Sequence, residues 1–367
     1  MRILFVHSIG RKKYGGGERW VINAANGMKL RGHHVVVAGR SHSVLLQEAR
    51  QRGIATATFN ILSDISLYQA LKLAFFIRKH QFDVVVCKGH ELLVCGMAVR
   101  WSGGKATLIR RAGSPPLKKS RKLVWRTRFF VDGVVTNTHT IREVYHQHGL
   151  EDPDLVRVIY NGLQPGDNTP AFTFDQYYPG RTIALCVGRA VGHKGYFYLI
   201  DALTQIRQFW PSLLFFVLGD GKDKNRLMDY ATEKGVADMI HFAGYVHEPT
   251  PYFKGCDFFV HPSLYEGMPN AAMEAMAYGK PVIMTRVNGA DELSAAGQFA
   301  WLIPAADSQA IADAVRRAYD NPEQFSEMGH EAKAWVRENF SMEKMISNLE
   351  DFIESKRSKG KNKAGRS

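Results

Sequence analysis

Two glutamates eight positions apart, Glu266 and Glu274, stand in the stretch LYEGMPNAAMEAMAYGKPV, residues 264–282. Glu266 lies in a turn that follows the apolar run DFFVHP, and Glu274 lies inside the helical pattern after that turn. Carboxylate oxygens accept hydrogen bonds from hydroxyl groups, and backbone amides at a helix N-terminus approach anionic oxygens. We therefore expect one row of groups that meets hydroxyls and phosphate, made of Glu266, Gly267, Met268, Pro269, Asn270 and Glu274. A helical glutamate is usually solvated or capping, but Glu274 lies among alanines and methionines, where an unpaired carboxylate is costly.

Two cations follow another strand pattern, in CVGRAVGHKGYFYLIDAL, residues 186–203. Gly188 and Arg189 end the strand, and Lys194 precedes the next helix. Two positive side chains at a strand-to-helix turn match the charge of a diphosphate, and an arginine binds such a group through two parallel hydrogen bonds. Ordinary surface charge is the alternative. A further strand-end loop begins at Gly244 and is placed to face a nucleotide base.

A third loop, YGGGERW near the N-terminus, places Gly16 and Gly17 before a helical pattern. Backbone without side chains at a helix N-terminus can approach a phosphate closely. The pattern is neither a Walker loop nor G-x-G-x-x-G, so a flexible turn is an equally good interpretation.

The segment RRAGSPPLKKSRKLVWRTRFF, residues 110–130, has eight Lys or Arg and no acid, with apolar residues interleaved. Such a segment suits anionic lipid headgroups, nucleic acid or an acidic substrate, and the interleaved aromatics favour a working surface over a solvated face. His90 follows an earlier strand and is a candidate for the same side. The expected acceptor or membrane surface comprises His90, Arg110, Arg111, Lys118, Lys119, Arg121, Lys122 and Trp125.

Short apolar strands alternate with helical patterns along the whole chain, which predicts parallel sheets covered on both faces. The expected strands are 2–8, 34–39, 83–88, 106–111, 133–137 and 156–162, then 182–189, 213–221, 240–245, 257–262, 281–286 and 299–304. This predicts an α/β protein with two doubly wound, Rossmann-like domains. Their expected bounds are 1–165 and 180–320, followed by C-terminal helices at 321–355 that are expected to pack back on the first domain, and a basic, disordered tail at 356–367.

The composition, 45% hydrophobic and 23% charged over 367 residues, is that of a globular protein. No apolar run is long enough for a transmembrane helix, and the N-terminus lacks a cleavage site for a signal peptide. Four cysteines lie far apart in apolar segments, as reduced thiols of a cytoplasmic protein would. With a net charge of +13, we expect a cytoplasmic protein held peripherally at the inner face of the cytoplasmic membrane.

The combination VGR…HKG, GDG and E-G-x-P-N-x3-E-A-M-A-x-G-x-P-V resembles the GT-B retaining glycosyltransferases of family 4, and the resemblance covers nearly the whole chain. It implies transfer of a sugar from a nucleotide diphospho-sugar, with Glu266 at the donor sugar and Glu274 at the ribose. It also implies that Arg189 and Lys194 bind the diphosphate, so that no metal or other cofactor is required, and that Gly16 and Gly17 approach the phosphates. Many members carry a histidine after the fourth N-terminal strand, whereas this sequence has Arg110 and Arg111 there.

The leading hypothesis is a transferase acting on a membrane-associated or anionic glycan or lipid acceptor, in lipopolysaccharide or other cell-envelope glycan synthesis. The alternative within GT-B is an enzyme with a soluble acceptor, such as a trehalose- or sucrose-type synthase, or a nucleotide-sugar epimerase. A nucleic-acid binder explains the charge but leaves Glu266 and Glu274 without a use. A dehydrogenase is disfavoured because no G-x-G-x-x-G opens either half.

Overall fold

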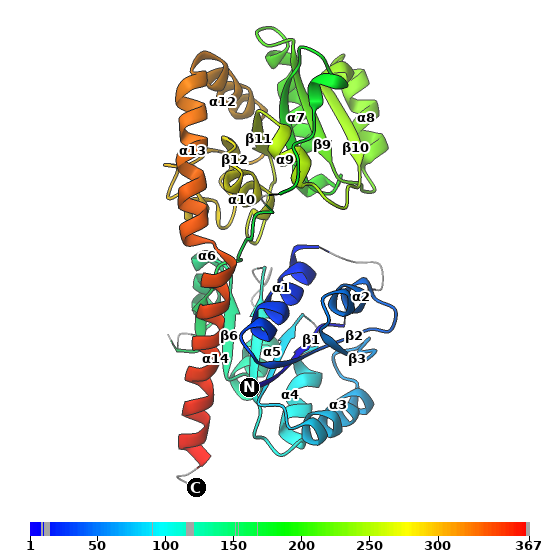
Figure 1. The fold of residues 1–367 in the computed structure, drawn as a ribbon, viewed down its shortest axis with the longest axis vertical. Helices are drawn as coiled ribbons and strands as arrows, with labels where there is room; N and C mark the ends of the chain where they lie inside the picture. Colours follow the sequence, from blue (N-terminus) through cyan, green and yellow to red (C-terminus); the bar gives the residue numbers. More distant parts are fainter. Residues whose placement is uncertain are drawn as a thin grey trace. The chain divides into compact units, whose positions relative to one another are not determined.

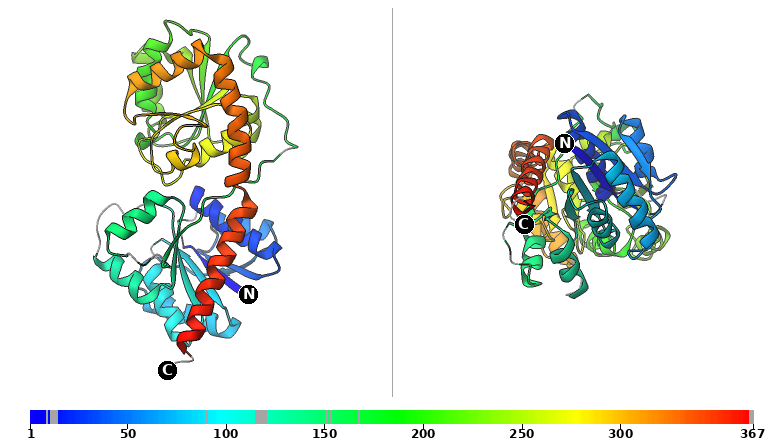
Figure 2. Two further views of the ribbon diagram at one scale, coloured as in Figure 1. Left: turned by 90° about the vertical axis from the view of Figure 1, so that its left-hand side faces the viewer. Right: turned by 90° about the horizontal axis from the view of Figure 1, so that it is seen from below.

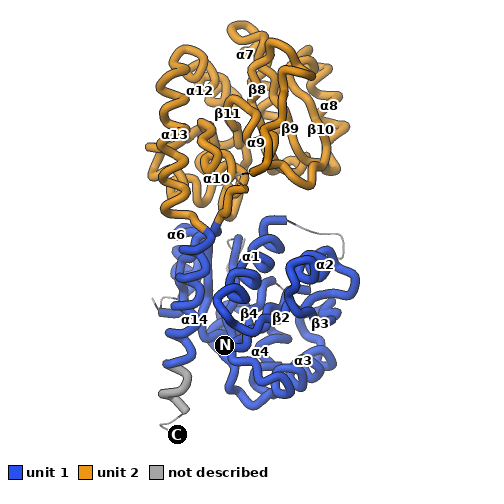
Figure 3. Tube along the Cα trace, in the orientation of Figure 1, with its two compact units in different colours: residues 1–162, 342–367 blue, residues 163–341 orange. Residues whose placement is uncertain are grey.

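The computed structural model describes residues 1–8, 10, 15–89, 91–114, 121–150, 152, 154–166 and 168–364, with side chains through residue 358. The chain forms two compact units (Figure 3). Unit 1 contains residues 1–162 and 342–367, and unit 2 contains residues 163–341.

Unit 1 is built on a parallel sheet of seven strands in the order β3-β2-β1-β4-β5-β6-β7 (Figure 1). Its strands are β1 (Arg2–Val6), β2 (His34–Gly39), β3 (Ala55–Thr58), β4 (Val84–Lys88), β5 (Thr107–Ala112), β6 (Gly133–Thr136) and β7 (Val156–Val158). Its helices are α1 (Gly16–Leu30), α2 (Val44–Gln51), α3 (Leu67–His80), α4 (Leu92–Trp101), α5 (Arg121–Phe130), α6 (His139–Gln147) and α14 (Met342–Ala364).

Unit 2 is built on a parallel sheet of six strands in the order β10-β9-β8-β11-β12-β13. Its strands are β8 (Thr182–Val187), β9 (Leu213–Leu218), β10 (Ile240–Gly244), β11 (Phe258–His261), β12 (Val282–Thr285) and β13 (Trp301–Ile303). Its α-helices are α7 (Tyr196–Ile206), α8 (Lys224–Glu233), α9 (Thr250–Gly255), α10 (Asn270–Ala277), α11 (Ala290–Leu293), α12 (Ser308–Asp320) and α13 (Pro322–Asn339), and the 3-10 turns are Phe174–Gln176, Gly192–Lys194 and Ala237–Met239.

The continuous apolar strands are explained by burial on both faces of each sheet. In β1, Leu4 and Val6 enter one core cluster, whereas Ile3 and Phe5 enter another. Successive side chains of a strand point to opposite faces, so a strand with helices on both sides needs apolar residues at every position. Helices α1 and α14 cover the Ile3 face, and Figure 2 shows α14 lying along this sheet.

Both sheets reverse their order at the same place. Strands β1 and β4 are neighbours in unit 1, and β8 and β11 are neighbours in unit 2, while the intervening strands of each pair lie to one side. In open α/β sheets, ligands bind beyond the carboxyl ends of the strands at such a switch point. The residues that follow these four strands are therefore the candidates for a ligand site.

The structure departs from the sequence-based expectations at three places. Strand β3 was not predicted because its sequence, ATAT, has no large apolar residue and its side chains are partly exposed at the edge of the sheet. The boundary between the units falls at residues 162–163, and α13 lies in unit 2 whereas α14 lies in unit 1. The tail expected to be disordered from residue 356 is helical as far as Ala364, and Lys356 is largely buried, donating to the carbonyl of Asp154.

Candidate functional site

In unit 2, the loops after β8 and β11 touch through their backbones. Gly195 is the N-cap of α7 and has a φ of 74°, and a Cβ placed on it would lie 1.8 Å from the carbonyl oxygen of Pro262. The amide of Leu264 donates to the carbonyl of His193 at 2.8 Å. Only glycine fits this contact, because a side chain would meet backbone that cannot rotate away. The contact fixes Lys194 beside the loop that carries Glu266.

Glycines also close the loop after β9 onto the loop after β8. A Cβ on Gly219 would lie 2.0 Å from the carbonyl oxygen of Gly188, and one on Gly221 would lie 2.3 Å from that of Ala190. The amide of Gly219 donates to the carbonyl of Gly244 at 2.7 Å. Gly188 and Gly244, which were predicted to contact a diphosphate and a nucleotide base, therefore belong to one backbone assembly at the carboxyl ends of β8, β9 and β10.

Glu266 is the centre of a polar cluster in unit 2. Its Oε1 atom forms an ion pair with Lys194 Nζ, accepts a hydrogen bond from Ser263 Oγ at 3.2 Å, and lies 3.3 Å from His261 Nε2. The side chains of Lys194 and Glu266 are only 15% and 19% exposed. The two residues predicted from separate motifs are thus brought into direct contact.

These contacts determine the charge of Glu266. Burial works to raise its pKa, but His261 and Lys194 together hold the pKa at about 2. Burial lowers the pKa of His261, so the imidazole is neutral at neutral pH. Glu266 is therefore a fixed carboxylate, suited to accept a hydroxyl proton in a hydrogen bond and to stabilise positive charge.

The helix that carries the second glutamate, α10, begins at Asn270 directly after the turn. Pro269 caps α10, Met268 is buried, and the amide of Asn270 donates to the carbonyl of Met268 at 2.8 Å. That amide is taken up within the turn, whereas the sequence predicted it to face a ligand. Glu274 is half-buried and has an interaction partner, which explains how a carboxylate is kept there.

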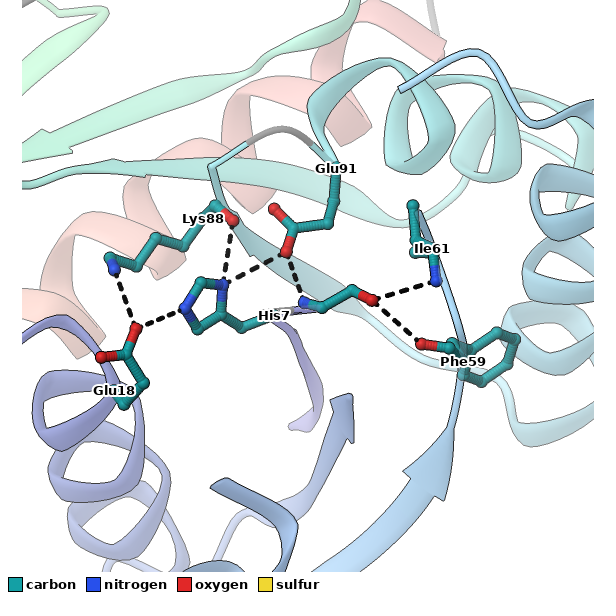
Figure 4. A network of polar contacts seen from close by, with 7 residues as sticks. His7, Glu18, Phe59, Ile61, Lys88 and Glu91 are labelled. Atoms are coloured by element: carbon teal, nitrogen blue, oxygen red, sulfur yellow. Dashed lines mark hydrogen bonds and ion pairs between the residues drawn. The ribbon is translucent and has the colours of Figure 1, made fainter. Parts of the chain in front are cut away.

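The switch point of unit 1 holds a second network, which the sequence did not predict (Figure 4). His7, directly after β1, contacts Glu18 Oε1 through Nε2 at 2.8 Å and Glu91 Oε1 through Nδ1 at 3.2 Å. Lys88 Nζ, at the end of β4, lies 3.6 Å from Glu18 Oε1, and the amide of Ser8 donates to Glu91. Two features of the sequence could have indicated this network, namely the charge of Glu18 in GGGER and the charge of Lys88 at the end of a strand.

The two glycines predicted to approach a phosphate lie in the first turn of α1. Glu18 caps this helix by accepting a hydrogen bond from the amide of Gly15 at 2.8 Å. A Cβ on Gly17 would lie 1.9 Å from Lys88 Nζ, so Gly17 leaves room for the ammonium group, while Gly16 is exposed.

Charge is unevenly distributed in the unit 1 network. Burial works to raise the pKa of Glu18, but His7 and Lys88 hold the pKa at about 2. Burial also works against a charged His7, yet Glu18 and Glu91 outweigh it and raise the pKa of the imidazole. The pKa of Lys88 is lowered, mainly by burial.

Only some members of the expected acceptor or membrane surface are exposed. Arg111 is buried, with Nη2 donating to Asn161 Oδ1 at 2.9 Å, so it does not belong to an exposed membrane surface. Arg110 is half-buried and donates to Thr127 Oγ1 at 3.4 Å, on the opposite face of β5. Both residues belong to a strand covered on both faces, which explains why they are not exposed. Further members lie on α5 with exposed side chains, namely Arg121, Lys122 and Trp125, while His90, Lys118 and Lys119 lie outside the described residues.

Helix α5 presents an aromatic and basic face. The rings of Trp125 and Phe129 are stacked at 5.3 Å, and the Arg100 guanidinium lies 3.9 Å from the centre of the Phe129 ring. The groove beside these rings has a volume of about 360 Å³, and its lining residues are Arg121, Val124, Trp125, Arg128, Phe129 and His148.

Comparison with known proteins agrees with this architecture. Residues 14–166 match the family described as Glycosyltransferase Family 4, and residues 173–335 match the family described as Glycosyl transferases group 1. The chain belongs to the family 4 glycosyltransferases. The fold is GT-B, as the likeness to the crystal structure of Anabaena Alr3699/HepE shows, with a TM-score of 0.84 and 21% identity over 97% of this chain and all of that one.

Two curated relatives of this glycosyltransferase align over most of their length. The lipopolysaccharide core biosynthesis glycosyltransferase LpsE of Rhizobium meliloti is 27% identical over 87% of this chain and 91% of that protein. The UDP-Gal:alpha-D-GlcNAc-diphosphoundecaprenol alpha-1,3-galactosyltransferase of Escherichia coli is 26% identical over 78% of each. Of the helices described, none combines the length and hydropathy needed to cross a bilayer.

Proposed function

We propose that this glycosyltransferase moves a sugar from a nucleotide diphospho-sugar to a glycan or lipid acceptor of the cell envelope, with retention of anomeric configuration. The observation that carries the proposal is the contact between Glu266 and Lys194, a fixed carboxylate and a cation at the switch point of unit 2. The names of LpsE and of the E. coli galactosyltransferase support an envelope acceptor. HepE has been crystallised with UDP and with UDP-glucose, which supports a nucleotide-sugar donor.

Each residue of the cluster has a separate task in this proposal. Glu266 accepts hydrogen bonds from hydroxyls of the donor sugar and stabilises positive charge as the glycosidic bond to the diphosphate breaks. It is unsuited to act as a general acid, because a carboxyl group with a pKa of about 2 holds no proton at neutral pH. Arg189, which is exposed, and Lys194 neutralise the departing diphosphate.

The first test is Glu266→Gln, which keeps the shape of the side chain and removes its charge. We expect turnover to fall by about two to three orders of magnitude, the scale of one lost transition-state contact. Affinity for UDP should change far less, because the carboxylate meets the sugar. Arg189→Ala serves as the matched variant, and it should weaken binding of the diphosphate product by roughly 1.5–3 kcal/mol. Near-normal turnover of the Glu266 variant, measured by release of product from each candidate nucleotide sugar, removes Glu266 from the site.

The proposal includes no divalent cation, because Arg189 and Lys194 supply the charge that a metal would supply. Transfer should therefore persist at the full rate in EDTA. Complete loss of transfer in EDTA, with recovery on adding Mg²⁺ or Mn²⁺, contradicts this assignment of the two cations.

We also propose that unit 1 lies against the inner face of the cytoplasmic membrane. Besides α5, helix α3 supports this location with a row of side chains that are each more than half exposed, namely Leu67, Tyr68, Leu71 and Phe75. Helix α3 contains Lys72, Arg78 and Lys79, all exposed, and no acidic residue. Apolar side chains beside lysines and arginines are typical of helices at an anionic lipid surface.

Two side-chain contacts connect α5 with its neighbours α3 and α4. An ion pair between Asp64, just before α3, and Arg126 of α5 joins these two helices, and Arg100 at the end of α4 lies over Phe129. An acceptor embedded in the membrane would be presented to this unit, whereas a soluble acceptor of the sucrose or trehalose type makes no use of the surface.

A further inference from the structure

Arg111 is a buried guanidinium whose hydrogen-bonding capacity is only partly used. The residue is 4% exposed, and its Nη2 atom donates to Asn161. Within the described part of the chain, Nε and Nη1 have no hydrogen-bond partner and Arg111 forms no ion pair with a carboxylate. A buried charge of this kind is costly unless a group of opposite charge meets it.

A second cation lies next to Arg111 in the sheet. Lys88 of β4 and Arg111 of β5 are paired in register. Val86 and Ile109, two residues before them, pack in the same core cluster as Trp20, so Lys88 and Arg111 continue that face of the sheet. Lys88 is 21% exposed, and the pair therefore runs from the surface into the interior.

The neighbouring groups are hydrogen-bond donors as well. The Arg111 guanidinium lies 4.7 Å from the centre of the Trp20 ring in α1, and the indole Nε1 of Trp20 has no acceptor among the described residues. A side chain at Gly113 would crowd the guanidinium of Arg111, since a Cβ there would lie 3.0 Å from Nη1. An indole and a guanidinium donate but do not accept hydrogen bonds, so the matching ligand is an acceptor with negative charge.

We propose that Arg111 and Lys88 bind an anionic group, a phosphate or a carboxylate, at the carboxyl ends of β4 and β5 in unit 1. Lys88 remains paired with Glu18, so Arg111 supplies the uncompensated charge and Lys88 lies at the open end. Assigning the anion to a substrate rests on the proposed function, and it belongs either to the diphosphate of the donor or to an acidic substituent of the acceptor. Binding of inorganic phosphate does not depend on the transfer reaction.

The experiment titrates the full-length protein with inorganic phosphate at constant ionic strength and follows the side-chain ¹⁵N–¹H signals of arginine and tryptophan. Phosphate should shift the signals of Arg111 and Trp20. Arg111→Gln should weaken this response about tenfold or more, the scale of a lost charged hydrogen bond. Arg110→Gln is the matched control, because Arg110 is the neighbour on the same strand, faces the other side and has Thr127 as its partner. It should respond as the wild type does.

Thermal unfolding provides a readout that does not require an assigned signal. Phosphate should raise the midpoint of the wild type and of Arg110→Gln but not that of Arg111→Gln, because ligand binding to the folded state stabilises it. In the absence of phosphate, Arg111→Gln should be folded and close to the wild type or above it in stability, since the uncompensated charge is removed. Arg111→Lys, which keeps the charge, is the second variant if glutamine proves unstable.

Substrate measurements then identify the source of the anion. If UDP affinity falls in Arg111→Gln as it does in Arg189→Ala, the anion is the donor diphosphate. If UDP affinity is unchanged and the KM for the acceptor rises, the anion is on the acceptor. A phosphate response that is equal in wild type and Arg111→Gln, or absent from the wild type, overturns the proposal. The proposed transfer reaction is tested separately by Glu266→Gln, and the result of that test does not depend on Arg111.

Discussion

At the residue scale, one carboxylate at each switch point is held ionised by buried partners. Glu18 in unit 1 and Glu266 in unit 2 both have a pKa of about 2, well below the ordinary value of 4.5. A group whose pKa is lower in the folded state stabilises the fold fully above its ordinary pKa, and this stabilisation is lost as the pH falls toward the folded value. Both units should therefore lose stability between about pH 4.5 and pH 2.

Glu18→Gln tests this dependence in unit 1. The difference between the ordinary pKa of 4.5 and the pKa of about 2 in the folded protein corresponds to about 3 kcal/mol, at about 1.4 kcal/mol per pH unit. We expect the variant to be less stable by up to about that amount at pH 7, and to lose less stability than the wild type between pH 4.5 and 2. Urea unfolding at a series of pH values measures both. Glu48→Gln is the control, because Glu48 pairs with Arg52 one helical turn away at the surface and should change stability little. If Glu18→Gln and the wild type lose the same stability between pH 4.5 and 2, the lowered pKa of Glu18 is not the cause of that loss.

The residues at the two switch points show how far the sequence alone predicts a site. The Glu266 motif and the Arg189 and Lys194 pair were identified from their spacing and from their position directly after predicted strands. Arg111 was expected at an acceptor or membrane surface, and its burial was not predicted, because both faces of a parallel sheet are buried. Alternation along TLIRRA therefore does not separate an inward arginine from an outward one. His7 was missed because its partners come from α1 and from the loop after β4, which only the folded sheet brings together.

At the element scale, the loops of unit 2 depend on glycines that touch backbone. Gly195 combines a φ of 74° with a carbonyl oxygen 1.8 Å from where a Cβ would stand. Gly180 has a similar φ of 69°, but no heavy atom lies within 4 Å of its Cβ position. The two glycines therefore separate the cost of left-handed backbone from the cost of the clash.

Gly180→Ala should lower the free energy of unfolding by about 1–2 kcal/mol, the cost of the left-handed conformation alone. Gly195→Ala should cost at least about 2 kcal/mol more, because Pro262 must move. It should also weaken UDP binding by displacing Lys194, which Gly180→Ala should not do. Urea unfolding and calorimetric titration with UDP measure these two effects. Equal destabilisation by both substitutions means that the loop gives way without strain.

The elements themselves follow from the sequence where burial is complete. The long apolar strands β2, β8 and β9 were predicted at or within a few residues of their bounds, since a continuous apolar run has no other stable environment. Strand β3 was not predicted, because an edge strand is defined by its hydrogen bonds to β2 and not by apolar side chains. The helical end of α14 was not predicted either, because a basic composition without apolar residues gives no periodicity to detect.

At the scale of the whole molecule, the two units repeat one design. Each has its first and fourth strands as neighbours, and each holds a carboxylate, a histidine and a lysine at that switch point. The units differ in their surfaces. Unit 1 carries the exposed apolar rows of α3 and α5, which the site in unit 2 does not explain.

Vesicle flotation across a salt series tests whether that surface meets a membrane. Wild type should bind anionic vesicles tightly at low salt, because each Lys or Arg at such a surface contributes about 1 kcal/mol, and should bind neutral vesicles weakly. Replacing Arg121 and Lys122 by Ser should remove part of the salt-sensitive binding. Replacing Leu71 and Phe75 by Ser should instead remove the binding that persists at high salt, since apolar insertion is not screened.

Leu30→Ser is the control for the apolar pair, because Leu30 is also highly exposed but lies at the end of α1. It should float as the wild type does. All these variants should retain their affinity for UDP, which separates membrane binding from the site in unit 2. Equal binding to neutral and anionic vesicles, or binding to neither, defeats the membrane proposal and leaves a soluble acidic acceptor as the better use of the positive charge. Leu30→Ser loses as much flotation as the variant at Leu71 and Phe75 only if any exposed apolar side chain of unit 1 contributes equally. In that case α3 has no special part in membrane binding.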